Sequence, residues 1–300
     1  MYQTTIKGST HLSGVGLHSG LPVDLVLRAA PADSGVVFCR VDLNPAACVS
    51  AHVRNVVDTQ LATTLAEGSA RVSTVEHLLA ALSGLQIDNV LVELNGPEIP
   101  VMDGSAEPFV RALQSVGTVE LLAARQYLRV LRTVEVAHGD ATATLSRSDG
   151  FSVGYTLIYD HPVFRGHPKH ARVDVNPLSF AAEVCRARTF GFMEDFDRLK
   201  SLKLALGAGF ENVVAVGDSH VLNEGGLRQI DEFVKHKVLD VIGDLALIGM
   251  PLIGHFEGFK SGHSLNNLLI RQLLAQPDAF EVIVDGRRCQ RAMTAPVATR

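Results

Sequence analysis

Cysteine is scarce in this sequence, and the few cysteines that occur are widely spaced. The four, Cys39, Cys48, Cys185 and Cys289, include no C-x-x-C pair. Disulfide-rich secreted domains and thiolate zinc sites both need closer or more numerous cysteines. We therefore expect neither a disulfide framework nor a cysteine metal site, and we expect a reducing, cytoplasmic location.

Long apolar runs and an excess of basic charge are also missing. No apolar segment approaches the roughly 20 residues needed to cross a bilayer, and the opening MYQTTIKGSTHL lacks the charged-then-apolar pattern of a signal peptide. The net charge is −5 and the basic residues are scattered, unlike the pattern of a nucleic-acid-binding protein. We expect a soluble monomer with no transmembrane segment and no nucleic-acid partner.

What the chain does have is enough apolar material for two ordinary domains or one large one, since 47% of its 300 residues are hydrophobic. Short apolar runs broken by Gly, Pro, Asn and Asp predict strands in the first third, with helices over 73–85 and 109–117. Strands return after residue 126, and a long helix follows them. Strands and helices mixed in each half favour an α+β fold over a doubly wound parallel sheet.

A weak similarity between two segments of the chain indicates a repeated unit. The triplet Val-Glu-His at 75–77 resembles Val-Lys-His at 234–236, and each lies on a predicted helix that follows strands. We therefore predict two similar domains, at 1–126 and 127–300, the first carrying His77.

A line of three ionisable groups interrupts the apolar helix that begins near Asp231 and stops at Gly249. His236, Asp240 and Asp244 recur every fourth residue, so they share one face. An imidazole and a carboxylate at this spacing can reach one metal ion, as in other helical metal sites. Asp244 lies roughly 12 Å along the axis from His236, too far to share that ion, and is expected to support the site instead.

The alternative for this helix is a solvent-exposed polar stripe, and the helix alone does not decide between the two. The helix is apolar on nearly every other side, which favours a half-buried stripe. Buried charges need a partner or a metal.

A third metal ligand is available in His77, which directly follows Glu76 in the first turn of the earlier helix. Ser73 and Glu76 also fit a capping box, and by itself that interpretation is the stronger. Two histidines and a carboxylate nevertheless leave one position open, as in catalytic zinc sites, and an adjacent glutamate supplies a general base. A ferrous facial triad needs no such base, and an H-x-x-E-H peptidase needs histidine where Ser73 stands.

The glycine-rich segment GHFEGFKSGHSLNN holds Lys260 and His263, the latter just before a predicted helix. A helix start disfavours a charged imidazole, so an acid role for His263 requires a carboxylate partner such as Asp244. Without the other motifs, a lone surface histidine is the simpler interpretation.

Together the segments TVEHLLAAL, MDGSA, RARTFGF, HKVLDVIGDL and KSGHSLNN closely resemble the zinc-dependent deacetylases of lipid A biosynthesis, which act on UDP-3-O-acyl-N-acetylglucosamine. The resemblance runs from GVGLHSG at 14–20 to about residue 275, and the combined motifs are highly specific.

The resemblance implies two domains, each a β-sheet with packed helices, and helices sandwiched between the two sheets. It implies cytoplasmic hydrolysis of the substrate's N-acetyl group, releasing acetate, with Zn²⁺ as cofactor or Fe²⁺ in its place. The residue roles that it implies are metal binding by His77, His236 and Asp240, base catalysis by Glu76, acid catalysis by His263 supported by Asp244, oxyanion binding by Thr189, and substrate contacts by Phe190, Lys237 and Lys260.

The segment 193–216 resembles an insert that forms an apolar passage for the acyl chain. Leu202, Leu204 and Leu206 are expected to line it, with an ordinary amphipathic insert as the alternative. Some members carry cysteine where this chain has Ala62. Two other functions stay open, a metal-dependent amidohydrolase acting on a different amide and a metal-stabilised binding protein without activity, which the retained Glu76 and His263 argue against.

Overall fold

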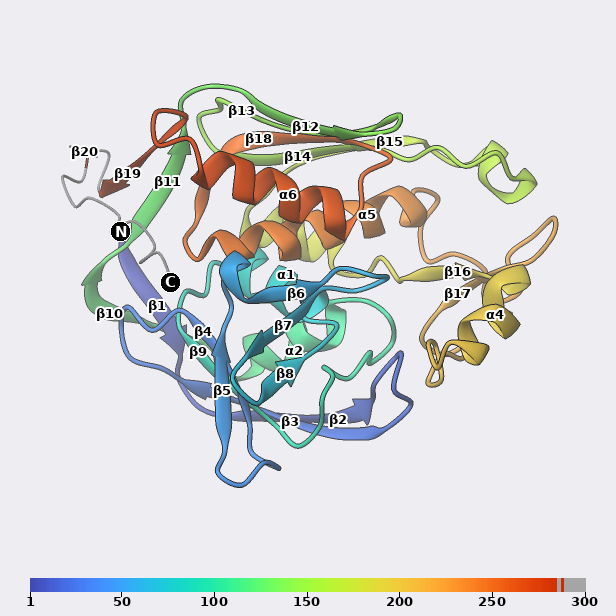
Figure 1. The fold of residues 1–300 in the computed structure, drawn as a ribbon, viewed down its shortest axis with the longest axis horizontal. Coiled ribbons are helices and arrows are strands. Elements are labelled where there is room, and N and C mark those ends of the chain that lie inside the picture. Colours follow the sequence, from blue (N-terminus) through green and yellow to red (C-terminus); the bar gives the residue numbers. More distant parts are fainter. Residues whose placement is uncertain (285–286, 289–300) are drawn as a thin grey trace.

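The fold places a layer of helices between two β-sheets, as Figure 1 shows. The computed structural model describes residues 1–284 and 287–288. A five-stranded sheet lies on one side of the helices and an eight-stranded sheet on the other. The predicted α+β sandwich is confirmed.

The five-stranded sheet is built from strands whose alternate residues are buried. In β3 (Pro22–Ala29), Val23, Leu25 and Leu27 face inward while their neighbours are more exposed, the period-two pattern of a half-buried strand. Only β4 and β9 pair in parallel; the other ladders of this sheet are antiparallel. The spatial order is β2 (Thr10–Val15), β3, β9 (Val90–Leu94), β4 (Val36–Arg40) and β5 (Ala47–Ser50).

Smaller ladders flank this sheet. They are β1 (Tyr2–Ile6) with β10 (Thr118–Ala124), and β6 (Val56–Asp58), β7 (Thr64–Glu67) and β8 (Ala70–Val72) in that order.

The eight-stranded sheet is centred on β18 (Leu252–Phe259), whose residues alternate strictly between buried and half-buried. It pairs in parallel with β11 and β14 and antiparallel with β13. The other strands are β11 (Gln126–Val130), β12 (Val134–His138), β13 (Ala141–Ser146), β14 (Phe151–Thr156), β15 (His170–Asp174), β19 (Phe280–Val284) and β20 (Arg287–Arg288).

Four helices form the middle layer, each close to its predicted position. They are α1 (Glu76–Gly84), α2 (Glu107–Val116), α5 (Glu232–Leu245) and α6 (His263–Leu274). The α5 helix continues into a short 3₁₀ turn and ends at Gly249, whose φ of 86° is the left-handed conformation typical of a glycine stop. In the part of the chain that the structure describes, no helix is both long and apolar enough to span a bilayer.

The remaining elements are short. They are the helices α3 (Pro177–Ser179) and α4 (Phe196–Ser201), the strands β16 (Phe190–Phe192) and β17 (Val214–Val216), the 3₁₀ turns η1 (Val53–Asn55), η2 (Pro162–Gly166), η4 (Met193–Asp195) and η5 (Ala246–Ile248), and the π turn η3 (Phe180–Val184).

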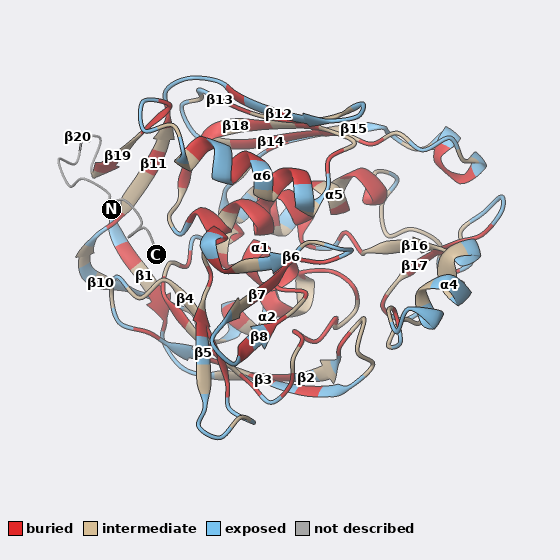
Figure 2. Ribbon diagram, in the orientation of Figure 1, coloured by how far each residue is buried: buried red, intermediate tan, exposed pale blue. Residues whose placement is uncertain are grey.

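The helices α1 and α5 are buried almost throughout, as the red ribbons of Figure 2 show. The ionisable residues His236, Asp240 and Asp244 of α5 are among the buried ones. The solvent-exposed polar stripe considered for this helix is therefore wrong. The helix packs against other elements on every side, so its polar face must be satisfied inside the protein.

We propose that the two domains meet near residue 126, at 1–126 and 127–300. Among the described residues, every sheet draws its strands from one side of Arg125. The strand before it, β10, pairs with β1, while the strand after it, β11, pairs with β18 and β19.

The expectation that the chain lacks a disulfide framework is wrong for one pair of cysteines. Cys39 in β4 lies directly opposite Cys48 in β5, and the two form a disulfide. The hairpin register brings them together, which the sequence spacing did not indicate. Cys185 is a free, buried thiol, and Cys289 lies outside the described residues.

Candidate metal centre and catalytic pocket

The helices α1 and α5 pack closely enough for side chains from both to meet. Gly243 on α5 faces the backbone carbonyl of Glu76 on α1, and a Cβ atom at Gly243 would lie 2.0 Å from that oxygen. Glycine is therefore needed for this approach. This close approach places the first turn of α1, which carries His77, against the face of α5 that carries His236 and Asp240.

The turn before α1 is held in an unusual conformation. Thr74 has a φ of 57°, which is rare for a β-branched residue. Its hydroxyl donates to Glu98, and the same carboxylate accepts the backbone N–H groups of His18 and Ser19. These hydrogen bonds fix the point from which α1 starts.

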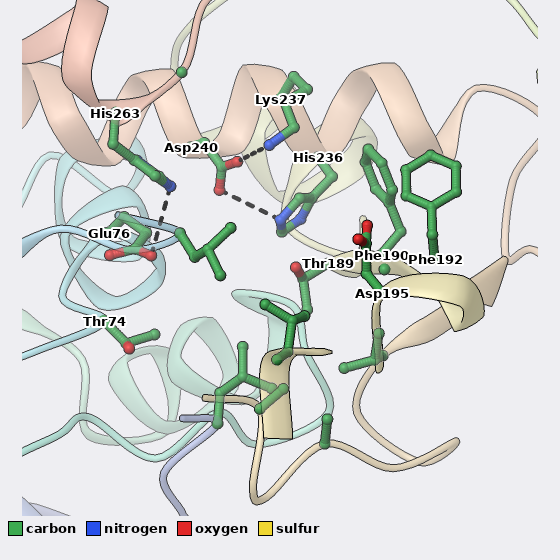
Figure 3. Close-up of a pocket in the computed structure, with 18 of the residues that line it drawn as sticks. Thr74, Glu76, Thr189, Phe190, Phe192, Asp195, His236, Lys237, Asp240 and His263 are labelled. Carbon is green, nitrogen blue, oxygen red and sulfur yellow. Dashed lines mark hydrogen bonds and ion pairs between the residues drawn. The ribbon is translucent and has the colours of Figure 1, made fainter. Parts of the chain in front are cut away.

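Three buried ligand atoms converge between the two helices, as Figure 3 shows for two of them. Oδ1 of Asp240 lies 3.3 Å from Nε2 of His236 and 3.6 Å from Nε2 of His77. All three atoms lie within 4.8 Å of one another. A zinc ion bound at about 2.0–2.1 Å in tetrahedral geometry needs ligand atoms roughly 3.3 Å apart, so this set has nearly the required spacing.

The protonation states also suit a cation. Nδ1 of His236 lies 3.0 Å from the carbonyl oxygen of Ala187, which can only accept, so this nitrogen carries the proton and Nε2 presents a lone pair. Burial lowers the pKa of His236 to about 3. Burial alone would raise the pKa of Asp240, but His236 and Lys237 hold it well below its usual range. Nε2 of His236 and the carboxylate of Asp240 thus both present lone pairs to the same space, an arrangement that a bound metal ion stabilises.

Glu76 lies beside this cluster and does not cap its helix. The N-cap residue is Val75, without a side-chain hydrogen bond, and Ser73 bonds to Thr64 instead. The capping-box alternative is therefore wrong. The carboxylate of Glu76 accepts the backbone N–H of Thr63 at 3.1 Å. Burial raises its pKa, although neighbouring histidines oppose the shift, so the group is suited to accept a proton.

His263 is the first residue of α6 and lies against two carboxylates. Its Nδ1 is 2.8 Å from Oδ2 of Asp244, and its Nε2 is 3.8 Å from Oε1 of Glu76. Burial would lower the pKa of His263, but Asp244 and Glu76 outweigh it and raise the pKa to about 10. Asp244 is held in turn by the Thr63 hydroxyl and the Asn266 amide. The imidazole is therefore a stable cation that can donate a proton.

These groups open into a cavity of about 850 Å³. Of the residues predicted for the site, all but Asp244 line it; Asp244 is buried behind His263. The metal-ligand cluster, Glu76 and His263 are at one end, and Figure 3 shows Thr189, Phe190 and Phe192 along the same space.

Thr189 is positioned by backbone contacts rather than by its side chain. Its N–H donates to the carbonyl of Gly104, and its own carbonyl accepts from Val214. Gly104 has a φ of 84°, and a Cβ there would lie 2.0 Å from the carbonyl oxygen of Asn212. The glycine of MDGSA thus permits the close approach that places Thr189. Glu232, at the start of α5, anchors the same segment through the Arg188 side chain and N–H.

The two predicted lysines differ in their surroundings. Nζ of Lys237 lies 2.7 Å from Oδ2 of Asp240 and 5.5 Å from the centre of the Phe190 ring. Burial disfavours its charge, but Asp240 outweighs burial and raises its pKa. Lys260 pairs with Asp140 across the outer edge of the cavity.

Sequence reasoning missed part of the cavity wall. Tyr159 and Phe192 line the cavity and form an aromatic cluster with Phe190 and with Phe164 and Phe233, which lie behind the wall. These residues come from separate segments with no shared spacing. A run of aromatics in YDHPVF and TFGF was the only local signal.

Tyr155 was also missed. It is buried, lines the cavity, and its hydroxyl donates to the carbonyl of Ser261, which lies in the loop between Lys260 and the start of α6 at His263.

The expected lining by Leu202, Leu204 and Leu206 is wrong. The insert contributes Leu199, Ala205 and other residues to the cavity instead. The α4 helix ends at Ser201, and positive φ angles at Lys203 and Ala205 reverse the chain, so helical spacing no longer selects the inward residues.

Comparison with known proteins agrees with this geometry. A model of the LpxC family, UDP-3-O-acyl N-acetylglycosamine deacetylase, matches residues 3–275. The chain belongs to this family. The UDP-3-O-acyl-N-acetylglucosamine deacetylase of Pseudomonas entomophila (strain L48) is 51% identical over 296 residues, which cover 99% of this chain and 96% of that protein. The family consists of metal-dependent hydrolases of amide bonds, and His77, His236 and Asp240 are the cluster with metal-ligand geometry in the described residues.

Proposed function

We propose that this chain is the zinc-dependent enzyme that hydrolyses the N-acetyl group of UDP-3-O-acyl-N-acetylglucosamine, releasing acetate and a free amine in lipid A biosynthesis. Family membership supports the reaction. The single structural observation that carries the proposal is a buried two-histidine, one-carboxylate cluster with the Glu76 carboxylate and the His263 imidazole, 3.8 Å apart, beside it.

His77, His236 and Asp240 would hold the metal. When bound there, Zn²⁺ polarises the amide carbonyl and lowers the pKa of a water molecule. Two neutral imidazoles and one carboxylate are a common catalytic zinc set. The same set binds Fe²⁺, and we propose Zn²⁺ because Glu76 supplies the base that a zinc hydrolase uses.

Glu76 and His263 divide the proton transfers. Glu76 accepts a proton from the attacking water, and its raised pKa matches that task. His263 then donates a proton to the departing amine, which would otherwise leave as an unstable anion. Asp244 is a positioning residue, because it fixes the imidazole and stabilises its charge.

Other pocket residues orient the substrate. We assign the hydroxyl of Thr189 to the oxyanion that develops on the amide carbonyl. Phe190 would pack against the sugar ring, while Lys237 and Lys260 would contact the polar head group. The insert at 193–216 would form the acyl passage, through Leu199 and Phe210.

We further propose that the enzyme acts as a monomer. We place the enzyme in the cytoplasm because its proposed substrate is a nucleotide sugar. The Cys39–Cys48 pair is the feature that does not follow from that location.

The ligand assignment is tested by elemental analysis of purified, folded variants. His77→Ala and Asp240→Ala should lose the equivalent of zinc that the wild type holds. His255→Ala is a matched control, because His255 lies on β18 outside the cavity. Retention of a full equivalent of zinc by the two ligand variants would overturn the assignment.

A further inference from the structure

The middle of the 193–216 insert exposes three large apolar side chains to solvent. Leu202, Leu206 and Phe210 are 55%, 46% and 58% exposed. Leu202 and Leu206 are absent from the cavity wall, whereas Phe210 both lines the cavity and reaches solvent. Single exposed leucines are ordinary, but these three lie within one short stretch at the cavity's edge.

Two unpaired cations accompany these side chains. Lys200 and Lys203 are exposed, and among the described residues neither has an ion-pair partner; Lys200 only lies over the ring of Phe196. Arg198, by contrast, is neutralised by Asp195. We define the insert tip as Lys200, Leu202, Lys203, Leu206 and Phe210.

The insert tip lies at the periphery of the protein, and hydrogen bonds tie it to the loop between β2 and β3. Its return segment is fixed by hydrogen bonds from the N–H groups of Leu206 and Gly207 to the carbonyls of His18 and Leu17. Figure 1 shows α4 at the periphery, beyond both sheets, and Figure 2 shows it largely exposed.

We propose that the insert tip is a contact surface for a lipid bilayer with anionic head groups. Apolar side chains flanked by lysines are the composition of interfacial membrane-binding segments. An anionic surface attracts nearby lysines. The same surface repels the chain as a whole, because its net charge is −5. That contrast favours an approach with the tip first. Acidic Asp197 precedes Lys200 on α4 and Glu211 directly follows Phe210, so the positive charge of the tip is confined to Lys200 and Lys203.

Contact with a bilayer would bring the enzyme close to its substrate, because an acylated substrate partitions toward bilayers. This benefit rests on the proposed function. Phe210 would then lie where the acyl chain passes between the lipid surface and the cavity. Docking itself does not depend on the reaction, so the two proposals fail separately.

The test is co-sedimentation of the metal-loaded enzyme with vesicles of phosphatidylcholine alone or mixed with phosphatidylglycerol. We expect binding to the mixed vesicles that weakens as salt rises. Leu202→Asp with Leu206→Asp, and separately Lys200→Glu with Lys203→Glu, should each weaken binding roughly tenfold or more.

Matched controls are Leu178→Asp, at a residue 83% exposed on α3, and Lys169→Glu, at an exposed lysine outside the cavity. Both should bind like the wild type. A wild type that does not sediment with the mixed vesicles, or tip variants that sediment as well as the controls, would overturn the proposal. So would a wild-type dimer, seen by analytical ultracentrifugation without lipid, that the tip variants abolish, since the tip would then bind a second copy.

The activity readout separates the two proposals. The tip variants should deacetylate a short-chain substrate in lipid-free buffer at the wild-type rate. Glu76→Gln should bind vesicles like the wild type while losing activity. A wild type that binds vesicles but leaves the substrate intact contradicts the proposed reaction alone.

Discussion

At the scale of single residues, the chemistry depends on environments that only the folded chain creates. Glu76 is an ordinary glutamate in the sequence, but burial raises its pKa and Thr63 orients one of its oxygens. His263 gains the opposite character, a stable positive charge, from Asp244. A base and an acid thus lie 3.8 Å apart with distinct tasks.

Glu76→Gln removes the base and keeps the shape. We expect zinc content and melting temperature to stay close to the wild type, with kcat lower by roughly 10²–10⁴-fold, the usual contribution of a positioned general base. Steady-state kinetics with elemental analysis check this. Turnover like that of the wild type would remove Glu76 from the mechanism.

Asp244→Asn tests the charge on His263. The acid form of His263 is needed, so activity should be lost as pH rises through its pKa, which Asp244 helps to raise to about 10. Loss of the Asp244 charge lowers that pKa, so the alkaline limb of kcat/KM should move to lower pH.

Activity below the alkaline limb should also fall, by roughly 10–100-fold, with zinc unchanged. The matched control is Asp231→Asn, a half-buried carboxylate at the N-cap of α5 and outside the cavity. An unmoved alkaline limb, or loss of zinc, would show that Asp244 has another role.

At the scale of elements, the site is a junction of two helices, and sequence patterns predicted its two halves unequally. The stripe of His236 and Asp240 follows from local spacing on α5. The addition of His77 required a contact between residues 159 positions apart, for which only ligand chemistry and the family resemblance argued. Gly243 permits that contact, but the sequence did not indicate this role. A glycine within a helix can be interpreted only when the element packed against it is known.

Other long-range pairings were equally invisible in the sequence. The Cys39–Cys48 pair depends on hairpin register. The inward side chains of the insert depend on turns at Lys203 and Ala205 that break helical periodicity. The helix positions were predicted well because periodicity and stop signals are local in the sequence. The residues of the cavity wall come from distant segments, so local patterns could not identify them.

Gly243→Ala should disrupt the junction. Alanine favours a helix by about 1 kcal/mol over glycine, but a Cβ at 2.0 Å from the Glu76 carbonyl forces the helices apart. Overpacking typically costs about 1–3 kcal/mol, so the variant should melt lower and bind zinc more weakly.

Calorimetry and zinc titration measure both effects. Gly225→Ala is the control, because nothing lies within 4 Å of a Cβ there. Normal stability and zinc affinity in Gly243→Ala would mean that the helix approach does not set the site.

At the scale of the whole molecule, the cavity lies between the helix layer and the peripheral insert and is large enough for an extended substrate. Its aromatic side includes Phe190 and Phe192, and the insert adds Leu199 and Phe210. The arrangement suits a ligand with a polar head and an apolar chain, as the family's substrate has.

Acyl-chain length should therefore control efficiency. Each buried methylene contributes about 0.8 kcal/mol, so each carbon removed from the chain should lower kcat/KM by roughly fourfold until the chain no longer reaches the insert. Phe210→Ala should flatten this dependence, while Leu178→Ala should not. Equal kcat/KM for short and long chains would exclude the passage.

The central claim is metal-dependent removal of the N-acetyl group at the junction of α1 and α5. Its most direct test is an amine-release assay on UDP-3-O-acyl-N-acetylglucosamine, run with the purified enzyme, after chelation, and after Zn²⁺ is restored. We predict release of free amine and acetate in equal amounts, loss of activity on chelation and its recovery with Zn²⁺. Undiminished amine release by the verified metal-free enzyme, or no release by the zinc-loaded enzyme, would contradict the account.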